Sequence, residues 1–522
     1  MFSTWKKVLL ASSLLAVLPA GAQAQNPPAS QKDLERRVQE LEAIVRQLQV
    51  ERQAPPGKPA SPTAEPKPPE GVIEVLDELP PEQSLPAPSD VAIDAADRLV
   101  TLQAPGAPGS PGIAPDRFGA DSIAGWSNGF FIQSPDRKYR LRITGQLQPD
   151  YRAYFISNNT QIVDEFVVRR ARLGIEAIVY EFFEFRLLPD FGQNQPRITD
   201  AYVNARPWDQ GQFAFGKFKQ PFSYEQLIQD RFYPLMERSL IDQLVPARDV
   251  GVMLHGREAF AGRFEYGFSA FNGQRDGNGD SNDREDVAGR VAFRPFNSDD
   301  FPVLRTLMFG MGVTTGIEQE PMLPAGLITP SGITWLQFNN GVVANGLRNR
   351  YSPELAYFYG PLGIVAQVFW MDQEIQAPRT PGGVQPGRVT VPFDGFFILS
   401  SLLLTGETRT SYAGALQPLR PFDPQRPFHG GYGAWELVGR VSRLSVASNA
   451  FQPGANQLVD PTLWSSGATE MTLGINWYLN SLVRLQLNYE HAWYDDPVRF
   501  GVSPGSIHRS SNALMTRFQV IF

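Results

Sequence analysis

The chain ends on Leu514-Met515-Thr516-Arg517-Phe518-Gln519-Val520-Ile521-Phe522, a stretch that alternates between two kinds of side chain. Arg517 and Gln519 fall on one face of a strand with this period. The opposite face is apolar and holds Leu514, Phe518, Val520 and Phe522. Such a strand is typical of a membrane barrel, whose apolar face meets lipid while its polar face meets a water-filled lumen. A soluble β-sandwich can show the same alternation, so the inference depends on how often the pattern recurs.

The same alternation recurs throughout residues 123–522. Clear runs are 139–148, 170–179, 436–442, 473–479 and 483–489. Short turns, such as 478–481, contrast with long polar connections at 272–286, 319–334, 373–392 and 408–430. Short turns at one end and long loops at the other are typical of a transmembrane barrel. At roughly 25 residues for a strand and its connection, the span predicts an all-β, antiparallel transmembrane barrel of about 16 strands, wide enough for an aqueous channel.

The first residues predict export. Lys6 and Lys7 precede the apolar run 8–18, and Ala22-Gln23-Ala24 supplies a small-x-small cleavage site, so residues 1–24 read as a signal peptide. The apolar run is too short to span a bilayer. Cysteine is absent, which excludes disulfides and thiolate metal sites. The 42% apolar content and the net charge of −7 resemble those of a soluble protein, as expected when half of each strand faces water.

Two further regions precede the expected barrel domain at 123–522. Residues 31–53 predict a short coiled-coil helix, because apolar residues follow heptad spacing at Leu34, Val38, Leu41, Val45 and Leu48. Self-association would explain this seam, and a trimer would match a trimeric barrel; the alternative is an amphipathic helix that rests on a partner protein. Residues 54–122 are rich in Pro and Ala, cannot bury a core, and predict a disordered linker.

Several segments within residues 128–522 resemble the family of phosphate-selective porins O and P. They include Asn128–Phe130, Arg169–Gly174, Gly216–Ser223, Met236–Arg238, Arg248–Val252 and Gly474–Asn480, in this order along the chain. The resemblance implies a trimeric, 16-stranded barrel in the outer membrane of a Gram-negative-type envelope. It also implies a loop folded inward to narrow the pore, which would be Phe222–Arg248 here. The preceding helix and linker would then lie in the periplasm.

Arginine dominates the basic residues of the expected barrel. Residues 123–522 contain 33 arginines and three lysines. A pore selects by the charge at its narrowest point, and the guanidinium fork matches phosphate and carboxylate oxygens. We therefore select as pore-lining, anion-binding candidates Arg140, Arg142, Arg170, Arg172, Lys217, Lys219, Arg231, Arg238 and Arg248.

The charge balance leaves the preference of the pore open. The same span holds 38 Asp and Glu against 36 Lys and Arg, and phosphate-selective members of the resembled family are richer in lysine at the pore. Two alternatives therefore stand: a general pore for small solutes and ions, and a pore that prefers anions such as phosphate. A third is a structural envelope-tethering protein, with the barrel as anchor and the N-terminal helix binding a periplasmic or cell-wall partner.

Signals for catalysis or cofactor binding are weak. Gly501–Gly505 matches G-x-S-x-G but lies between two expected strands, without the strand, sharp turn and helix of a nucleophile elbow. The four histidines lack metal-ligand spacing. We therefore expect no enzyme, cofactor, metal site or nucleic-acid partner. The expected partners are outer-membrane lipid, small anions or other small solutes, and further copies of the chain.

Overall fold

The structure is a computed structural model that describes residues 123–156, 162–275, 277, 279–280, 282–322, 324–379, 386–427, 430–454, 457–500 and 506–522. The expected signal peptide, coiled-coil helix and linker lie outside the described residues, as does the Gly501–Gly505 motif.

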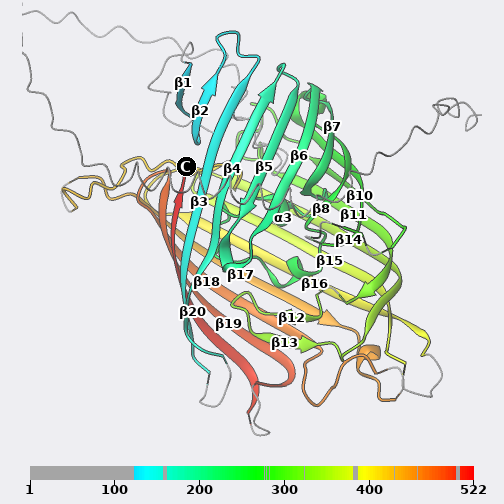
Figure 1. Ribbon diagram of the computed structural model, residues 1–522. Coiled ribbons are helices and arrows are strands. Elements are labelled where there is room, and N and C mark those ends of the chain that lie inside the picture. Colours follow the sequence, from blue (N-terminus) through cyan, green and yellow to red (C-terminus); the bar gives the residue numbers. More distant parts are fainter. Residues whose placement is uncertain are drawn as a thin grey trace, which may run out of the picture. The chain divides into compact units, whose positions relative to one another are not determined.

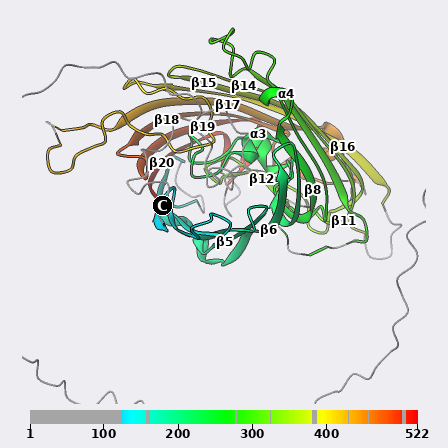
Figure 2. The same ribbon diagram turned by 90° about the horizontal axis from the view of Figure 1, so that it is seen from above.

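Within the described residues, sixteen antiparallel strands form a closed barrel (Figures 1 and 2). The last strand pairs with the first, with Met515 opposite Arg152, so the wall has no open edge. The strands are β3 (Arg140–Tyr154), β4 (Glu165–Val179), β5 (Phe183–Asp190), β6 (Arg197–Trp208), β7 (Gly211–Lys219), β8 (Arg248–Glu258), β9 (Phe264–Phe271), β10 (Asp286–Phe293), β11 (Met308–Pro321), β14 (Val343–Tyr359), β15 (Leu362–Gln376), β16 (Arg388–Leu403), β17 (Ala434–Val446), β18 (Gly467–Tyr478), β19 (Val483–Arg499) and β20 (Ile507–Ile521).

The alternation expected for the last strand is confirmed. Arg517 is 1% exposed and Gln519 is buried, whereas Phe518 is 43% exposed on the outer face. In β3, Arg140 and Arg142 are buried inside. Successive side chains of a strand point to opposite sides, so the sequence pattern alone separates the inner face from the outer face.

The carboxyl terminus completes the barrel seam. Phe522 exchanges backbone hydrogen bonds with Gly145, at 2.6 and 3.0 Å, and its ring covers this glycine. Beyond that point β2 (Phe130–Gln133) pairs with β3, with Phe130 opposite Ile143. The short β1 (Ala124–Trp126) then pairs with β2. β2 therefore occupies the part of the β3 edge that β20 leaves unpaired.

The two ends of the barrel differ in their connections. Short turns at 180–182, 209–210, 360–361 and 479–482 lie at the end that holds the carboxyl terminus, here named the turn end; the opposite end is the loop end. The connection 404–433 is an exception. It follows Leu403 of β16, which pairs with Glu436 of β17, so this long connection lies at the turn end. The expectation that every long connection shares one end is therefore wrong.

Among the described residues, two connections from the loop end fold into the barrel. The first inner loop, residues 220–247, contains α3 (Tyr224–Leu227) and the 3-10 helix η3 (Leu240–Gln243). The second inner loop, residues 322–342, contains the hairpin of β12 (Gly326–Ile328) and β13 (Thr334–Gln337). Figure 2 places α3 and β12 inside the ring of strands. The family resemblance implied the first of these loops, whereas the sequence indicated only a long polar connection at 319–334.

The inside of the barrel contains an apolar core. Inward side chains of β15 and β16, such as Phe369, Phe393 and Phe397, belong to one buried cluster with side chains of both inner loops, including Ile241 and Trp335. The polar inner face expected from the alternation is therefore interrupted by an apolar region, because the inner loops cover this part of the wall and exclude water from it.

The remaining helices of the described residues are short. They are η2 (Gly192–Asn194), α4 (Ala259–Gly262) and η4 (Ser448–Phe451). Among the described residues, no helix has the length and apolar content that a bilayer crossing requires.

Candidate functional site

The first inner loop has one apolar side and one charged side. On the apolar side, η3 packs on the wall of β16 and β17, where Leu240 N donates to Ser442 Oγ at 3.3 Å. At the start of the loop, Ser223 caps α3 by accepting a hydrogen bond from Gln226 N. Further along, Asn476 Nδ2 of β18 donates to Pro234 O at 2.7 Å. The loop is therefore held against the wall on which its apolar residues pack.

The charged side of the loop reaches β3, β4 and β20 through Glu237. Arg169 donates to both carboxylate oxygens, from Nε at 2.7 Å and from Nη2 at 3.0 Å. Arg517 Nη2 and Arg152 Nη2 approach Oε1 at 3.1 and 3.2 Å, and Arg170 Nη2 lies 3.8 Å from Oε2. In the described part of the chain, four wall arginines thus surround one carboxylate of the loop. We name these four the arginine cradle.

Asp230 forms a second charged contact between the first inner loop and the wall. Its Oδ2 lies 2.6 Å from Arg172 Nη1 and 3.7 Å from Arg170 Nε. Its Oδ1 lies 2.6 Å from Arg238 Nη1 of the same loop. Arg172 also pairs with Asp190 at 2.9 Å. Asp230 therefore connects the loop to β4 beside the arginine cradle.

Burial and neighbouring charge act differently on the four carboxyl groups of the loop. Burial alone would raise the pKa of Asp230 and Glu237, but nearby arginines, chiefly Arg238 for Asp230 and Arg169 for Glu237, hold both pKa values well below the ordinary range. For Glu225 and Asp242, burial prevails and raises the pKa. The contacts with the wall thus depend on ionised carboxylates.

A β-bulge brings Arg169 to this site. Strict alternation would place Arg169 on the side of β4 opposite to Arg170. The register of β3 and β4 shifts between Gln148, which pairs with Arg170, and Pro149, which pairs with Val168. Arg169 is therefore the extra residue of a bulge, which changes the direction of a side chain.

The nine candidates chosen from the sequence are all buried or half-buried, and the structure separates them into groups. Arg170, Arg172 and Arg238 meet at Asp230. Arg231 and Arg248 line a cavity together with Arg172 and Asp230. Arg142 Nε donates to Glu176 at 2.7 Å, and Arg140 lies over the Phe131 ring. Arg248 Nε donates to Asp200 at 2.6 Å. Lys219 Nζ donates to Ile228 O at 2.7 Å, and Lys217 is buried in β7.

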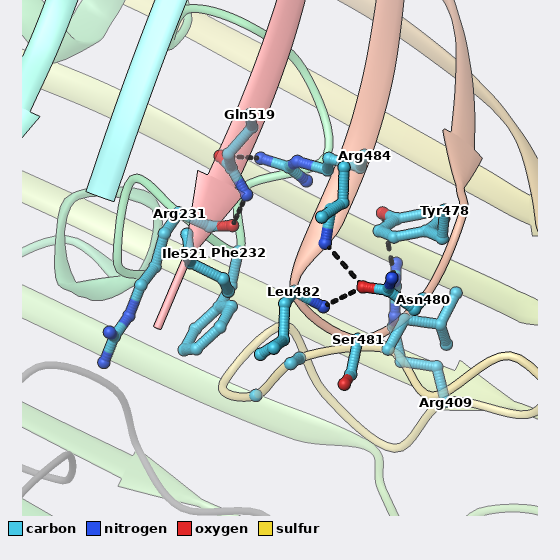
Figure 3. A pocket seen from close by; sticks show the side chains of 14 residues that line it. Arg231, Phe232, Arg409, Tyr478, Asn480, Ser481, Leu482, Arg484, Gln519 and Ile521 are labelled. Atoms are coloured by element: carbon cyan, nitrogen blue, oxygen red, sulfur yellow. Dashed lines mark hydrogen bonds between the residues drawn. The ribbon is translucent and has the colours of Figure 1, made fainter. Parts of the chain in front are cut away.

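Arg231 also lines a second cavity, which lies near the turn end (Figure 3). Its Nε donates to Gln229 Oε1 at 2.8 Å, and burial lowers its pKa to about 9. Arg484 Nη2 donates to Gln519 Oε1 at 3.1 Å, and Gln519 Nε2 donates to Arg231 O at 3.0 Å. Arg409, from the connection 404–433, also lines this cavity. Guanidinium groups therefore continue from the first inner loop toward the turn end.

Sequence reasoning missed part of the cluster. Arg152, Arg169 and Arg517 were not among the candidates, and neither were Glu237 and Asp230. The inward position of Arg517 follows from the alternation of the last strand, which was a usable signal. Arg169 lacked such a signal, because its direction depends on the bulge.

A closed barrel with an apolar outer face, a loop folded inside and charged groups along the lumen defines an outer-membrane channel protein. The family model for "Phosphate-selective porin O and P" matches residues 141–522, and the chain belongs to this family. The protein is therefore an outer-membrane porin, which forms a water-filled channel for passive diffusion of small solutes and ions. Its family and fold are those of a channel.

Known proteins similar to this chain include Porin O of Pseudomonas aeruginosa, which is 21% identical over 437 residues, covering 77% of this chain and 93% of the relative. Among solved structures, the anion-selective porin from Comamonas acidovorans is 12% identical, with a TM-score of 0.43 and coverage of 74% and 100%. The outer membrane channel DcaP of Acinetobacter baumannii is 9% identical, with a TM-score of 0.43 and coverage of 75% and 99%.

Proposed function

We propose that this porin prefers small anions, including phosphate-like oxyanions. The observation that carries the proposal is the surplus of guanidinium groups beside the first inner loop. In the described part of the chain, Asp230 and Glu237 are the loop carboxylates that contact the β3, β4 and β20 wall. They face five wall arginines: Arg152, Arg169, Arg170, Arg172 and Arg517. The wall carboxylates Asp150 and Asp190 pair with the same arginines, so five wall guanidinium groups stand against four carboxylates, and Arg238 of the loop adds a sixth guanidinium. Surplus positive charge at a constriction favours anions over cations.

Successive weak sites would allow an anion to pass without being trapped. Arg170 approaches both Glu237 and Asp230, and Arg231, the residue after Asp230, lines a cavity with Arg409 and Arg484. An arginine fork binds two oxygens of an oxyanion, and neighbouring carboxylates weaken that binding. This arrangement favours flux of many small anions over tight retention of one.

Reversal potential in a planar bilayer, measured across a tenfold KCl gradient, tests the preference. We expect the reversal potential of the wild-type channel to have the sign that shows chloride to be more permeant than potassium. Arg170→Ala, which removes a guanidinium beside both loop carboxylates, is expected to shift the potential toward cation selectivity. Arg426→Ala is the control, because Arg426 is exposed in the connection 404–433 and pairs with Asp423. A cation-selective wild type, or equal shifts in both variants, would contradict the proposal.

We also propose a homotrimer whose turn end faces the periplasm, together with the expected helix and linker. Strands β5, β9 and β10 have eight residues each, fewer than the roughly 9–11 that a membrane-crossing strand needs. A neighbouring protomer that packs against β5, β9 and β10 would cover this part of the wall, where the strands are too short to span the lipid bilayer. The mass of the detergent-solubilised protein, measured by light scattering, tests this; a monomer would contradict it.

A further inference from the structure

Glu237 fills a site that is shaped for a separate oxyanion. The bidentate hydrogen bonds from Arg169, with Arg517 and Arg152 on Oε1, are the contacts that a free carboxylate or phosphate would make with the same groups. All four cradle arginines belong to barrel strands, whereas Glu237 belongs to a loop. The arginine cradle is therefore part of the barrel wall, whereas the carboxylate that fills it is attached to the first inner loop.

From this geometry we infer that Glu237 is a specificity-determining residue, a built-in counter-anion that limits how strongly the pore selects and retains oxyanions. The inference rests on the proposed anion preference and names the group that sets its strength. A permeating oxyanion must compete with a carboxylate held at high local concentration by its own chain. Glu237 therefore keeps the cradle weakly binding, which suits rapid passage.

A structural role for Glu237 makes a different prediction. If the carboxylate serves only to fasten the first inner loop, its removal changes loop order and channel noise but leaves the ratio of anion to cation permeability unchanged. Arg517 also donates to Met236 O at 2.7 Å, and Arg440 Nη1 donates to Glu237 O at 2.8 Å. These backbone contacts hold the same part of the loop without the Glu237 carboxylate, so charge and anchoring are separable.

The experiment compares three variants of the full-length protein in planar bilayers. Glu237→Gln removes the charge, Glu237→Asp keeps the charge with a shorter side chain, and Glu225→Gln makes the same chemical change elsewhere in the loop. Glu225 accepts hydrogen bonds from Ser239 Oγ at 2.6 Å and from Tyr233, both within the loop. In the described part of the chain it forms no ion pair with the wall. Glu225→Gln therefore shows the effect of altering hydrogen bonds within the loop while the ion pairs between the loop and the wall stay intact.

We expect Glu237→Gln to raise the chloride-to-potassium permeability ratio about threefold or more, because the loss of one negative charge in the lumen favours anions over cations. We expect inorganic phosphate at millimolar concentration to block the chloride current of this variant more strongly than that of the wild type. Glu237→Asp should stay close to the wild type, and so should Glu225→Gln.

Three results would overturn the inference. One is an unchanged permeability ratio in Glu237→Gln, and a second is an equal shift in Glu225→Gln. The third is the absence of phosphate block in a Glu237→Gln channel that is folded, as judged by its heat-dependent gel mobility. Failure of the proposed function has a different signature, because a cation-selective wild type contradicts the anion preference while the shift caused by Glu237→Gln can still be measured.

Discussion

At the scale of single residues, buried ion pairs hold the inner loop to the wall. Arg517 illustrates this, because it donates to both oxygens of Asp150, each at 2.7 Å, and also reaches Glu237. Breaking a buried pair leaves an uncompensated charge in a poorly solvated place, whereas an exposed pair loses little when it is broken.

Arg517→Met is therefore expected to destabilise the barrel by about 3–5 kcal/mol, because Asp150 loses its principal partner. Arg443→Met is the matched control. Arg443 pairs with Asp495 at 2.6 Å, but both side chains are more than one-third exposed, so the expected loss is below about 1 kcal/mol. Urea unfolding in detergent, followed by gel mobility, measures both. Equal losses would contradict the assignment of Arg517 to a buried network.

At the scale of elements, the first inner loop combines an apolar side with a charged side. Each side responds differently to pH. The carboxyls of Asp230 and Glu237 have lowered pKa values, so they stabilise the docked loop above their ordinary pKa values of 3.8 and 4.5, and this stabilisation is lost as the pH falls further. Glu225 and Asp242 have raised pKa values, so their contribution has the opposite sign and decreases as the pH rises.

We therefore expect the charged side of the loop to detach in acid while its apolar side stays packed. Open-channel current noise should be constant from neutral pH down to about pH 5 and increase below about pH 4, where the ion pairs of Asp230 and Glu237 are lost. The increase should be smaller in Glu237→Gln, which lacks one of these groups. Noise that already increases between pH 7 and pH 5 would contradict this account.

At the scale of the whole molecule, the seam and the inner core determine the shape of the channel. The seam packs closely at Gly145, because a Cβ atom there would lie 2.1 Å from the Phe522 ring. The apolar core packed by the two inner loops fills part of the lumen. The charged residues of β3, β4 and β20 lie opposite it, across the first inner loop. One barrel thus encloses a dry region and a charged region.

Gly145→Val is expected to weaken the seam by displacing the terminal ring, which should lower the temperature at which the folded band disappears on a gel. Gly439→Val is the control in another strand of the same barrel, where an added Cβ would meet only Leu473, at 3.6 Å. Because a Gly-to-Val change is favourable for strand propensity, the control should be neutral or slightly stabilising. Equal destabilisation of both variants would contradict a special role for the seam.

Much of the candidate site was predictable from the sequence, and the remainder depended on register. Arg170 and Arg172 were placed inside the barrel by alternation, and the first inner loop was expected from its residues and from the family resemblance. Arg169 could not be placed, because the bulge opposite Pro149 reverses its side. The ion pair of Arg517 with Asp150 joins strands at the two ends of the domain, so only barrel closure brings the partners together.

The sequence by itself determined the class of fold, because a period of two between apolar and polar residues, repeated in strand after strand, separates a lipid face from an inner face. It also determined the dominance of arginine among the basic groups. Only the tertiary structure decided which arginines meet carboxylates and which part of the lumen is dry. These features depend on loops that fold back across the barrel, and local periodicity carries no information about where such a loop will pack.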